Sequence, residues 1–307
     1  MSVSGTISIL LAVVVVVIVT ALVSLYFVAR NKWKARFGEY ISFEGCRCFS
    51  GDYQTDCKQT LELKPQWSAY PTSLKSLMSL ISRFEVGIIH GDEELYTTQI
   101  SNDAVKLLRG PGSSIPLCTV YRDGSHLIVA CRGTADAYDW GQNAKVKQTA
   151  PFPSVSSTVA VHTGFLNEYK RIEAEFILSL NDSSAPVKQL SLVGHSMGCG
   201  VAALCALYTV FNRPDVAVSG LFVASPRIGN ADMVNALSRA NIVTLVNVAD
   251  PFPTLPPALT PTSFFRSGGY YDYRHMGKVL SFNEYGPTVM NMHSVYVYWK
   301  FLTSIAE

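Results

Sequence analysis

One segment in the second half of the chain constrains the fold more than any other. An apolar stretch, Leu190–Val193, leads into Gly-His-Ser-Met-Gly at Gly194–Gly198, and a run of small and apolar residues follows. A Gly-x-Ser-x-Gly sequence exposes its serine when a strand turns sharply into a helix. Gly194 and Gly198 leave room for that turn, because side chains there would collide with the strand and the helix. The segment predicts an α/β fold with Ser196 at the end of a central strand.

Short apolar runs separated by helix-length intervals extend this pattern. Ser219–Ala224 and Ile242–Val248 follow the serine and predict further strands. Before it, Leu117–Tyr121 and His126–Cys131 flank an Asp-Gly turn and predict a hairpin. Helical periodicity over Ser73–Arg109 predicts N-terminal helices with a turn in between. Strands that alternate with helices indicate a largely parallel central sheet.

A serine hydroxyl needs a base and an orienting carboxylate to act as a nucleophile. In α/β-hydrolases these groups follow the serine in the order Ser, Asp or Glu, His. Asp250 directly follows the apolar stretch Ile242–Ala249 and precedes a proline, so it lies where a predicted strand opens into a loop. The competing acidic residues lie in polar or tyrosine-rich surroundings, and they are Asp215, Asp232 and Asp272. Asp250 is therefore the predicted carboxylate.

Two histidines that follow Asp250 compete for the role of the base. His293 precedes Ser294–Trp299, which predicts a final helix that can hold the preceding loop over the carboxyl edge of the sheet. His275 lies in a tyrosine-rich segment and is the rival. We favour His293. The amide of Met197, at the N-terminus of the helix after the serine, is expected to point toward a developing oxyanion.

A second feature lies at the N-terminus. The stretch 7–29 is apolar and uncharged, and at about 1.5 Å per helical residue it can cross a bilayer of about 30 Å. The segment is too long, and its N-terminal flank too uncharged, for a cleaved signal peptide. We expect an N-terminal tail at 1–6, a transmembrane helix at 7–29, a juxtamembrane segment at 30–60 and a globular domain at 61–307. Basic residues directly after the helix favour a single-pass membrane protein with its domain in the cytosol.

Composition and cysteines exclude several classes of protein. The chain is 48% hydrophobic, with a formal net charge of +2, which argues against a disordered chain and against a nucleic-acid partner. Four cysteines in apolar or small-residue stretches are expected to be buried thiols, namely Cys118, Cys131, Cys199 and Cys205. Three more cysteines follow the predicted anchor, namely Cys46, Cys48 and Cys57. Their spacing does not match that of zinc ligands, and we expect them to be surface thiols or acylation sites. We expect no metal and no cofactor.

Six segments, in one order, resemble the fungal-type class 3 lipase family within the α/β-hydrolases. The resemblance covers roughly residues 80–300. It is carried by Ala130–Thr134, Val161–Tyr169, Gly194–Gly198, Ser225–Asn230, Val246–Pro257 and Tyr273–Gly277. The resemblance implies a second oxyanion donor at Thr134, and it implies His293 rather than His275 as the base.

Three further polar residues in these segments are expected to be structural. His195 should pack behind the turn that carries the serine, and Arg132 should anchor its loop through buried hydrogen bonds. His162 is expected to be a structural hydrogen-bonding residue rather than a base.

The residues and the resemblance together predict a membrane-anchored serine lipase. It would hydrolyse acyl esters of lipids, acylglycerols or phospholipids, through Ser196, Asp250, His293 and an acyl-enzyme. One alternative is a lipid acyltransferase that uses the same three residues. Another is a catalytically inactive, membrane-tethered lipid-binding protein.

Overall fold

The computed structural model describes residues 74–90, 106–111, 113–134, 142–143, 145–182, 186–262, 269–285 and 289–304. All of them belong to the unit Leu61–Glu307. The predicted tail, anchor and juxtamembrane segment, with Cys46, Cys48 and Cys57, lie outside the described residues. Within the described part of the chain, no helix is both long and apolar enough to cross a bilayer.

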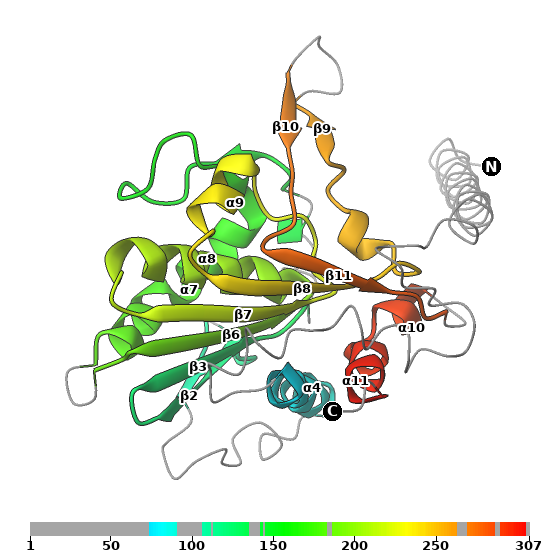
Figure 1. Ribbon diagram of the computed structural model, residues 1–307, viewed down its shortest axis with the longest axis horizontal. Coiled ribbons are helices and arrows are strands. Elements are labelled where there is room, and N and C mark those ends of the chain that lie inside the picture. The colour runs from blue at the N-terminus through cyan, green and yellow to red at the C-terminus, as the bar shows by residue number, and fades with distance from the viewer. Residues whose placement is uncertain are drawn as a thin grey trace, which may run out of the picture. The chain divides into compact units, whose positions relative to one another are not determined.

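A mostly parallel sheet forms the centre of the described domain (Figure 1). Its strands are β1 (Lys106–Leu108), β2 (Cys118–Asp123), β3 (His126–Cys131), β6 (Gln189–His195), β7 (Ala217–Val223), β8 (Asn241–Asn247) and β11 (Lys278–Phe282). In space the order is β1-β2-β3-β6-β7-β8-β11. The five strands from β3 to β11 run parallel, whereas β1 and β2 pair antiparallel at one edge. The predicted hairpin, the predicted strands after the serine and the largely parallel sheet are confirmed.

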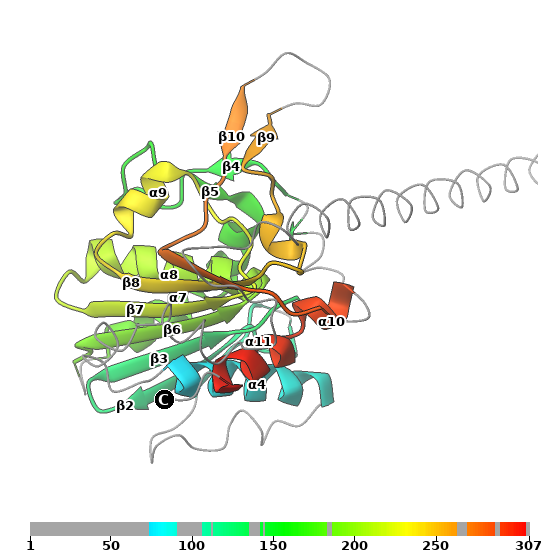
Figure 2. The same cartoon turned by 45° about the vertical axis from the view of Figure 1, so that its right-hand side comes forward.

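Helices cover both faces of this sheet (Figures 1 and 2). One face carries α7 (Thr163–Leu180), α8 (Met197–Asn212) and α9 (Ala231–Ala236). The other face carries α4 (Leu74–His90) and α11 (Val295–Ser304), which pack against each other. The short helix α10 (Val289–His293) directly precedes α11, and together they confirm the predicted final helix. Helix α8 is buried on nearly all sides, as expected of a helix that is apolar all round.

Small elements complete the described chain beyond the sheet. A short pair joins β4 (Gln148–Thr149) to β5 (Val161–His162), which leads into α7. The 3-10 turn η1 (Phe252–Thr254) follows β8. A hairpin of β9 (Leu259–Pro261) and β10 (Tyr270–Asp272) projects beyond the sheet (Figure 2).

The predicted N-terminal helices are only partly present. Helix α4 ends at His90, where the turn was expected. The expectation of a helix reaching Arg109 is wrong, because Lys106–Leu108 forms the edge strand β1, with Leu108 opposite Cys118. Pairing with β2 supplies this segment with backbone partners from another part of the chain, which local periodicity does not reveal.

The four cysteines expected as buried thiols are all buried, but two of them are bonded to each other. Cys118 and Cys131 lie directly opposite on β2 and β3 and form a disulfide, with their Cα atoms 4.2 Å apart. The expectation of free thiols is wrong for this pair, because the hairpin register brings the two side chains together. Cys199 and Cys205 are buried free thiols, as expected.

Candidate active site

Ser196 stands on the turn between β6 and α8. Its backbone has φ 52° and ψ −125°, a left-handed conformation that is strained for a residue with a side chain. A Cβ at Gly194 would lie 2.7 Å from the backbone nitrogen of Cys199, and one at Gly198 would collide with the carbonyl of Cys131. The two glycines therefore permit the turn, which the backbone N–H of Ser196 anchors by donating to the carbonyl of Val223 at 2.9 Å.

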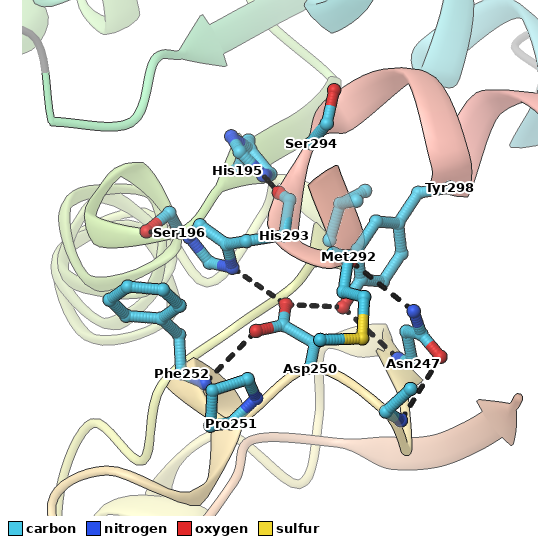
Figure 3. Close-up of polar contacts among 12 residues, drawn as sticks. His195, Ser196, Asn247, Asp250, Pro251, Phe252, Met292, His293, Ser294 and Tyr298 are labelled. Atoms are coloured by element: carbon cyan, nitrogen blue, oxygen red, sulfur yellow. Dashed lines mark hydrogen bonds and ion pairs between the residues drawn. The ribbon is translucent and has the colours of Figure 1, made fainter. Parts of the chain in front are cut away.

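Three side chains from different elements form one hydrogen-bonded chain at this turn (Figure 3). His293, at the end of α10, places Nε2 2.8 Å from Ser196 Oγ. Its other ring nitrogen, Nδ1, lies 2.6 Å from Oδ2 of Asp250, which follows β8. Because a carboxylate only accepts, Nδ1 carries the proton and Nε2 is free to accept the serine proton. The structure thus brings the three predicted residues together in the order that activates a hydroxyl.

The carboxylate of Asp250 is fully engaged and almost completely buried. Its Oδ1 accepts from the backbone N–H of Phe252 at 3.0 Å, and its Oδ2 accepts from the hydroxyl of Tyr298 at 2.9 Å. That hydroxyl itself accepts from the backbone N–H of Asn247 at 3.0 Å. Together with His293, these donors hold both oxygens of Asp250 in place (Figure 3).

Tyr298 and Asn247 are the members of this network that sequence reasoning missed. Asn247 ends β8, and its side-chain amide donates to the carbonyl of Met292 at 3.2 Å, which ties the strand to the residue before His293. Tyr298 reaches the carboxylate from the first turns of α11. Asn247 lies in the segment Val246–Pro257 that carries Asp250, whereas Tyr298 lies outside the six segments, and the packing of α11 brings it to the carboxylate.

Burial sets the protonation of His293. The pKa of His293 is lowered from its ordinary value, because burial disfavours the imidazolium more than the hydrogen bond and charge of Asp250 favour it. The imidazole is therefore neutral at pH 7, which is the form that can accept a proton from Ser196.

Met197 and Thr134, the two residues predicted to donate to an oxyanion, both lie near Ser196. Met197 is the first residue of α8, where a backbone N–H has no acceptor within the helix. Thr134 follows Gly133 in the loop after β3, and it lines a cavity together with Ser196. Its hydroxyl accepts from the side-chain amide of Asn143 at 2.9 Å. The structure places both predicted donors beside the serine.

The same loop is held by Arg132. The buried guanidinium donates to the carbonyl of Pro116 at 2.8 Å and to that of Gly133 at 2.6 Å. This is the anchoring arrangement expected from the sequence.

Two cavities adjoin Ser196. The larger, of about 510 Å³, also borders Thr134 and His293, and its apolar lining comprises Ile88, Ile115, Phe252, Met290 and Val295. The smaller, of about 200 Å³, has an apolar lining of Val146, Phe165, Met197, Phe252, Leu255 and Pro256. Apolar walls beside a nucleophile suit a substrate with a hydrocarbon part.

The remaining histidines of this region have structural contacts. His162 accepts from the backbone N–H of Gly164 at 3.1 Å and stacks on Phe165, as expected of a structural residue. His275 lines neither cavity, and burial together with the nearby Arg227 lowers its pKa to about 4. His195 packs behind the turn, as expected.

No group of three or more metal-ligating side chains occurs among the residues that the structure describes.

Part of the chain that carries the Ser196 network is similar to known proteins. The family model for class 3 lipases matches residues 128–260, which include Ser196 and Asp250. The curated "Lipase" of Rhizomucor miehei is 30% identical over 139 residues, which is 43% of this chain and 38% of that protein. The segment that carries the serine turn and Asp250 is therefore similar to class 3 lipases.

Other known proteins match a similar share of the chain. "Phospholipase A1-II 3" of Oryza sativa subsp. japonica is 25% identical over 172 residues, which is 47% of this chain and 40% of that protein. The matches therefore span about two fifths of the length of these curated relatives, 38% and 40%. The native propeptide complex of Rhizomucor miehei lipase aligns with a TM-score of 0.50 at 20% identity, and covers 69% of this chain and 68% of that one. That likeness shows the shared α/β-hydrolase fold.

Proposed function

We propose that the chain is a carboxylic ester hydrolase, a serine lipase that cleaves acyl esters of lipids. The observation that carries this proposal is the hydrogen-bonded chain from Ser196 through His293 to Asp250, next to an apolar cavity of about 510 Å³. A neutral base, an activated hydroxyl and space for a hydrocarbon chain are what ester cleavage of a lipid requires.

The reaction follows from the positions of these groups. His293 Nε2 takes the proton of Ser196 as its Oγ attacks the ester carbonyl, and Asp250 holds the imidazolium that forms. The amides of Thr134 and Met197 stabilise the oxyanion of the tetrahedral intermediate. His293 then gives its proton to the departing alcohol, which leaves an acyl-enzyme on Ser196. Water, deprotonated by the same imidazole, releases the fatty acid and restores the serine.

Acylglycerols or phospholipids are the substrate class that we propose. Both cavities beside Ser196 have apolar walls, which favours long acyl chains over small polar acids. Two relatives are named "Lipase" and "Phospholipase A1-II 3". Cleavage of lipid esters is the chemistry that we propose for this chain.

We further propose that residues 7–29 anchor the enzyme in a membrane. The support is the uncharged apolar stretch itself, followed by basic residues at Arg30, Lys32, Lys34 and Arg36. This flank favours a catalytic domain in the cytosol. The disulfide between Cys118 and Cys131 favours the opposite orientation, because disulfides persist in oxidising compartments. Orientation is therefore open to a direct test.

Labelling and turnover of the full chain in membranes test the function. We expect a fluorophosphonate to label Ser196, and we expect the same membranes to release fatty acid from diacylglycerol, triacylglycerol or phosphatidylcholine vesicles. Labelling with turnover of short soluble esters alone would contradict a lipid substrate. Acyl transfer to an added alcohol or lysolipid in preference to water would indicate the acyltransferase. Vesicle binding that Ser196→Ala leaves unchanged, without labelling or turnover, would indicate the inactive binding protein.

Protease protection in sealed microsomes tests the orientation. Asn181-Asp182-Ser183 is the sequence's single acceptor for N-glycosylation, and Asn181 is exposed at the end of α7. With the domain in the cytosol, added protease should digest residues 61–307, and Asn181 should carry no glycan. A protected domain with a glycan that Asn181→Gln removes would reverse the orientation. Full extraction of the chain by alkaline carbonate would contradict the anchor.

A further inference from the structure

A buried carboxylate on α4 contacts two parts of the active site. Glu85 Oε1 accepts from the backbone N–H of Gly133 at 2.7 Å and lies 2.8 Å from Nδ1 of His195. Gly133 directly precedes the proposed oxyanion donor Thr134, and His195 directly precedes Ser196. One oxygen atom therefore joins the oxyanion loop to the turn that carries the nucleophile. The mechanism described above uses neither Glu85 nor the ring of His195.

His195 extends this connection to the proposed base. Its Nε2 lies 2.9 Å from the backbone carbonyl of His293, and the two imidazole rings are 5.1 Å apart between centroids. A carbonyl only accepts, so Nε2 of His195 carries a proton. If Nδ1 carries a second proton and donates it to the carboxylate of Glu85, the ring is an imidazolium. Both of its nitrogens then donate a hydrogen bond. Hydrogen bonds then link Gly133, His195 and the backbone of His293.

The pKa shifts of Glu85 and His195 agree with a charged pair at this distance. Burial alone would raise the pKa of Glu85, but His195 and the N–H of Gly133 outweigh it and bring that pKa below its ordinary value. Burial alone would lower the pKa of His195, but Glu85 and the carbonyl of His293 outweigh it and raise that pKa. Both side chains are mostly buried, with 12% of Glu85 and 7% of His195 exposed. Attraction between two buried charges is largely offset by their desolvation, so such a pair adds little to folding stability.

We infer that Glu85 and His195 form a positioning pair, which holds the oxyanion loop, the turn of Ser196 and the backbone of His293 in one geometry for acyl transfer. The inference rests on the proposed function, because it assigns these residues to the same site. It adds a function for α4, an element that precedes the region matched by the family model.

Glu85→Gln separates positioning from simple packing. The amide keeps the size of the side chain and an oxygen that can still accept from Gly133. Without the carboxylate, burial leaves His195 neutral, with a single N–H. If the amide oxygen stays on Gly133, that N–H can bond to this oxygen or to the carbonyl of His293, but not to both. If the NH₂ group turns to Nδ1 instead, His195 keeps its bond to His293, but Gly133 loses its acceptor. Either way the variant breaks one of the three links of the pair while the core remains filled.

The same substitution changes the charge around the base. Charged or titratable groups reach His293 from several elements, and they are Asp250 after β8, His195 at the end of β6, Glu85 on α4 and Tyr298 on α11. The nearby imidazolium of His195 lowers the pKa of His293, and the more distant Glu85 raises it to a smaller extent. Loss of both charges should raise the pKa of His293. Because turnover needs the neutral imidazole, the acid limb of kcat/KM should move to higher pH.

The test measures hydrolysis of a soluble p-nitrophenyl ester against pH, with the rate of fluorophosphonate labelling and the melting temperature. We expect Glu85→Gln to lower kcat about 10- to 100-fold at pH 7, with KM little changed and the acid limb shifted upward. His195→Gln removes the same imidazolium and should give the same two changes, so it serves if Glu85→Gln does not fold.

Glu168→Gln is the matched control. Glu168 is a fully buried carboxylate on α7, paired with Arg171 at 2.6 Å and outside both cavities. We expect it to lower the melting temperature while kcat and the acid limb stay unchanged. A folded Glu85→Gln variant with the kcat and acid limb of the wild type would overturn the inference, as would the same shift in Glu168→Gln. If the wild-type protein is neither labelled nor active, the result contradicts the proposed function rather than this inference.

Discussion

Ser196→Ala is expected to lower ester turnover by about 10⁶-fold and to abolish labelling by a fluorophosphonate. The hydroxyl of Ser196 is positioned to attack, with His293 Nε2 2.8 Å away to take its proton. His293→Ala should have a comparable effect, because an unassisted serine hydroxyl at pH 7 keeps its proton and attacks poorly. Single-turnover kinetics with a p-nitrophenyl ester measure both losses.

His275→Ala provides the matched control for the base. Like His293 it is a largely buried histidine near the C-terminus, but it lines neither cavity beside Ser196. We expect labelling and turnover to persist in this variant, with a lower melting temperature from the lost packing. Labelling that survives in His293→Ala and disappears in a folded His275→Ala would show that the base has been assigned to the wrong histidine.

The parts of the fold that could be predicted from sequence are those that local patterns encode. The Asp-Gly turn fixed the hairpin of β2 and β3, and short apolar runs marked β6, β7 and β8. The pentapeptide at Gly194–Gly198 predicted the sharp turn on steric grounds, and in the structure both glycines lie against backbone atoms. Asp250 was recognisable because it follows the end of a strand, and parallel strands end at one edge of a sheet.

The parts that could not be predicted depend on contacts between distant segments. Glu85 meets His195 across 110 residues of sequence, and Tyr298 meets Asp250 across 48. No spacing rule relates such positions, because the packing of α4 and α11 on the sheet decides them. The strand at Lys106–Leu108 also arises from pairing in the sheet, about which local periodicity carries no information. The disulfide of Cys118 differs, because the register of the predicted hairpin places it opposite Cys131, and the expectation of free thiols did not use that register.

Asp250→Asn is expected to lower kcat by about 10⁴-fold while the fold is retained. The reason lies in the donors around the carboxylate. Oδ1 faces the backbone N–H of Phe252 at 3.0 Å, a donor that cannot turn away. The asparagine will therefore keep its oxygen toward Phe252 and place its NH₂ group where Oδ2 was, facing His293. An NH₂ group donates to Nδ1, which forces the ring proton onto Nε2, and a protonated Nε2 cannot accept the proton of Ser196.

A control variant and a spectroscopic measurement distinguish an altered tautomer of His293 from the loss of charge or of packing. Asp272→Asn is the control, since Asp272 was a competing candidate and pairs with Arg274 on the protein surface at 2.8 Å. It should leave kcat unchanged, because a surface ion pair contributes little and lies outside both cavities. Nitrogen-15 chemical shifts of His293 should show the proton on Nδ1 in the wild type and on Nε2 in Asp250→Asn. A variant that keeps the wild-type tautomer and yet loses activity would assign the role of Asp250 to its charge on the imidazolium instead.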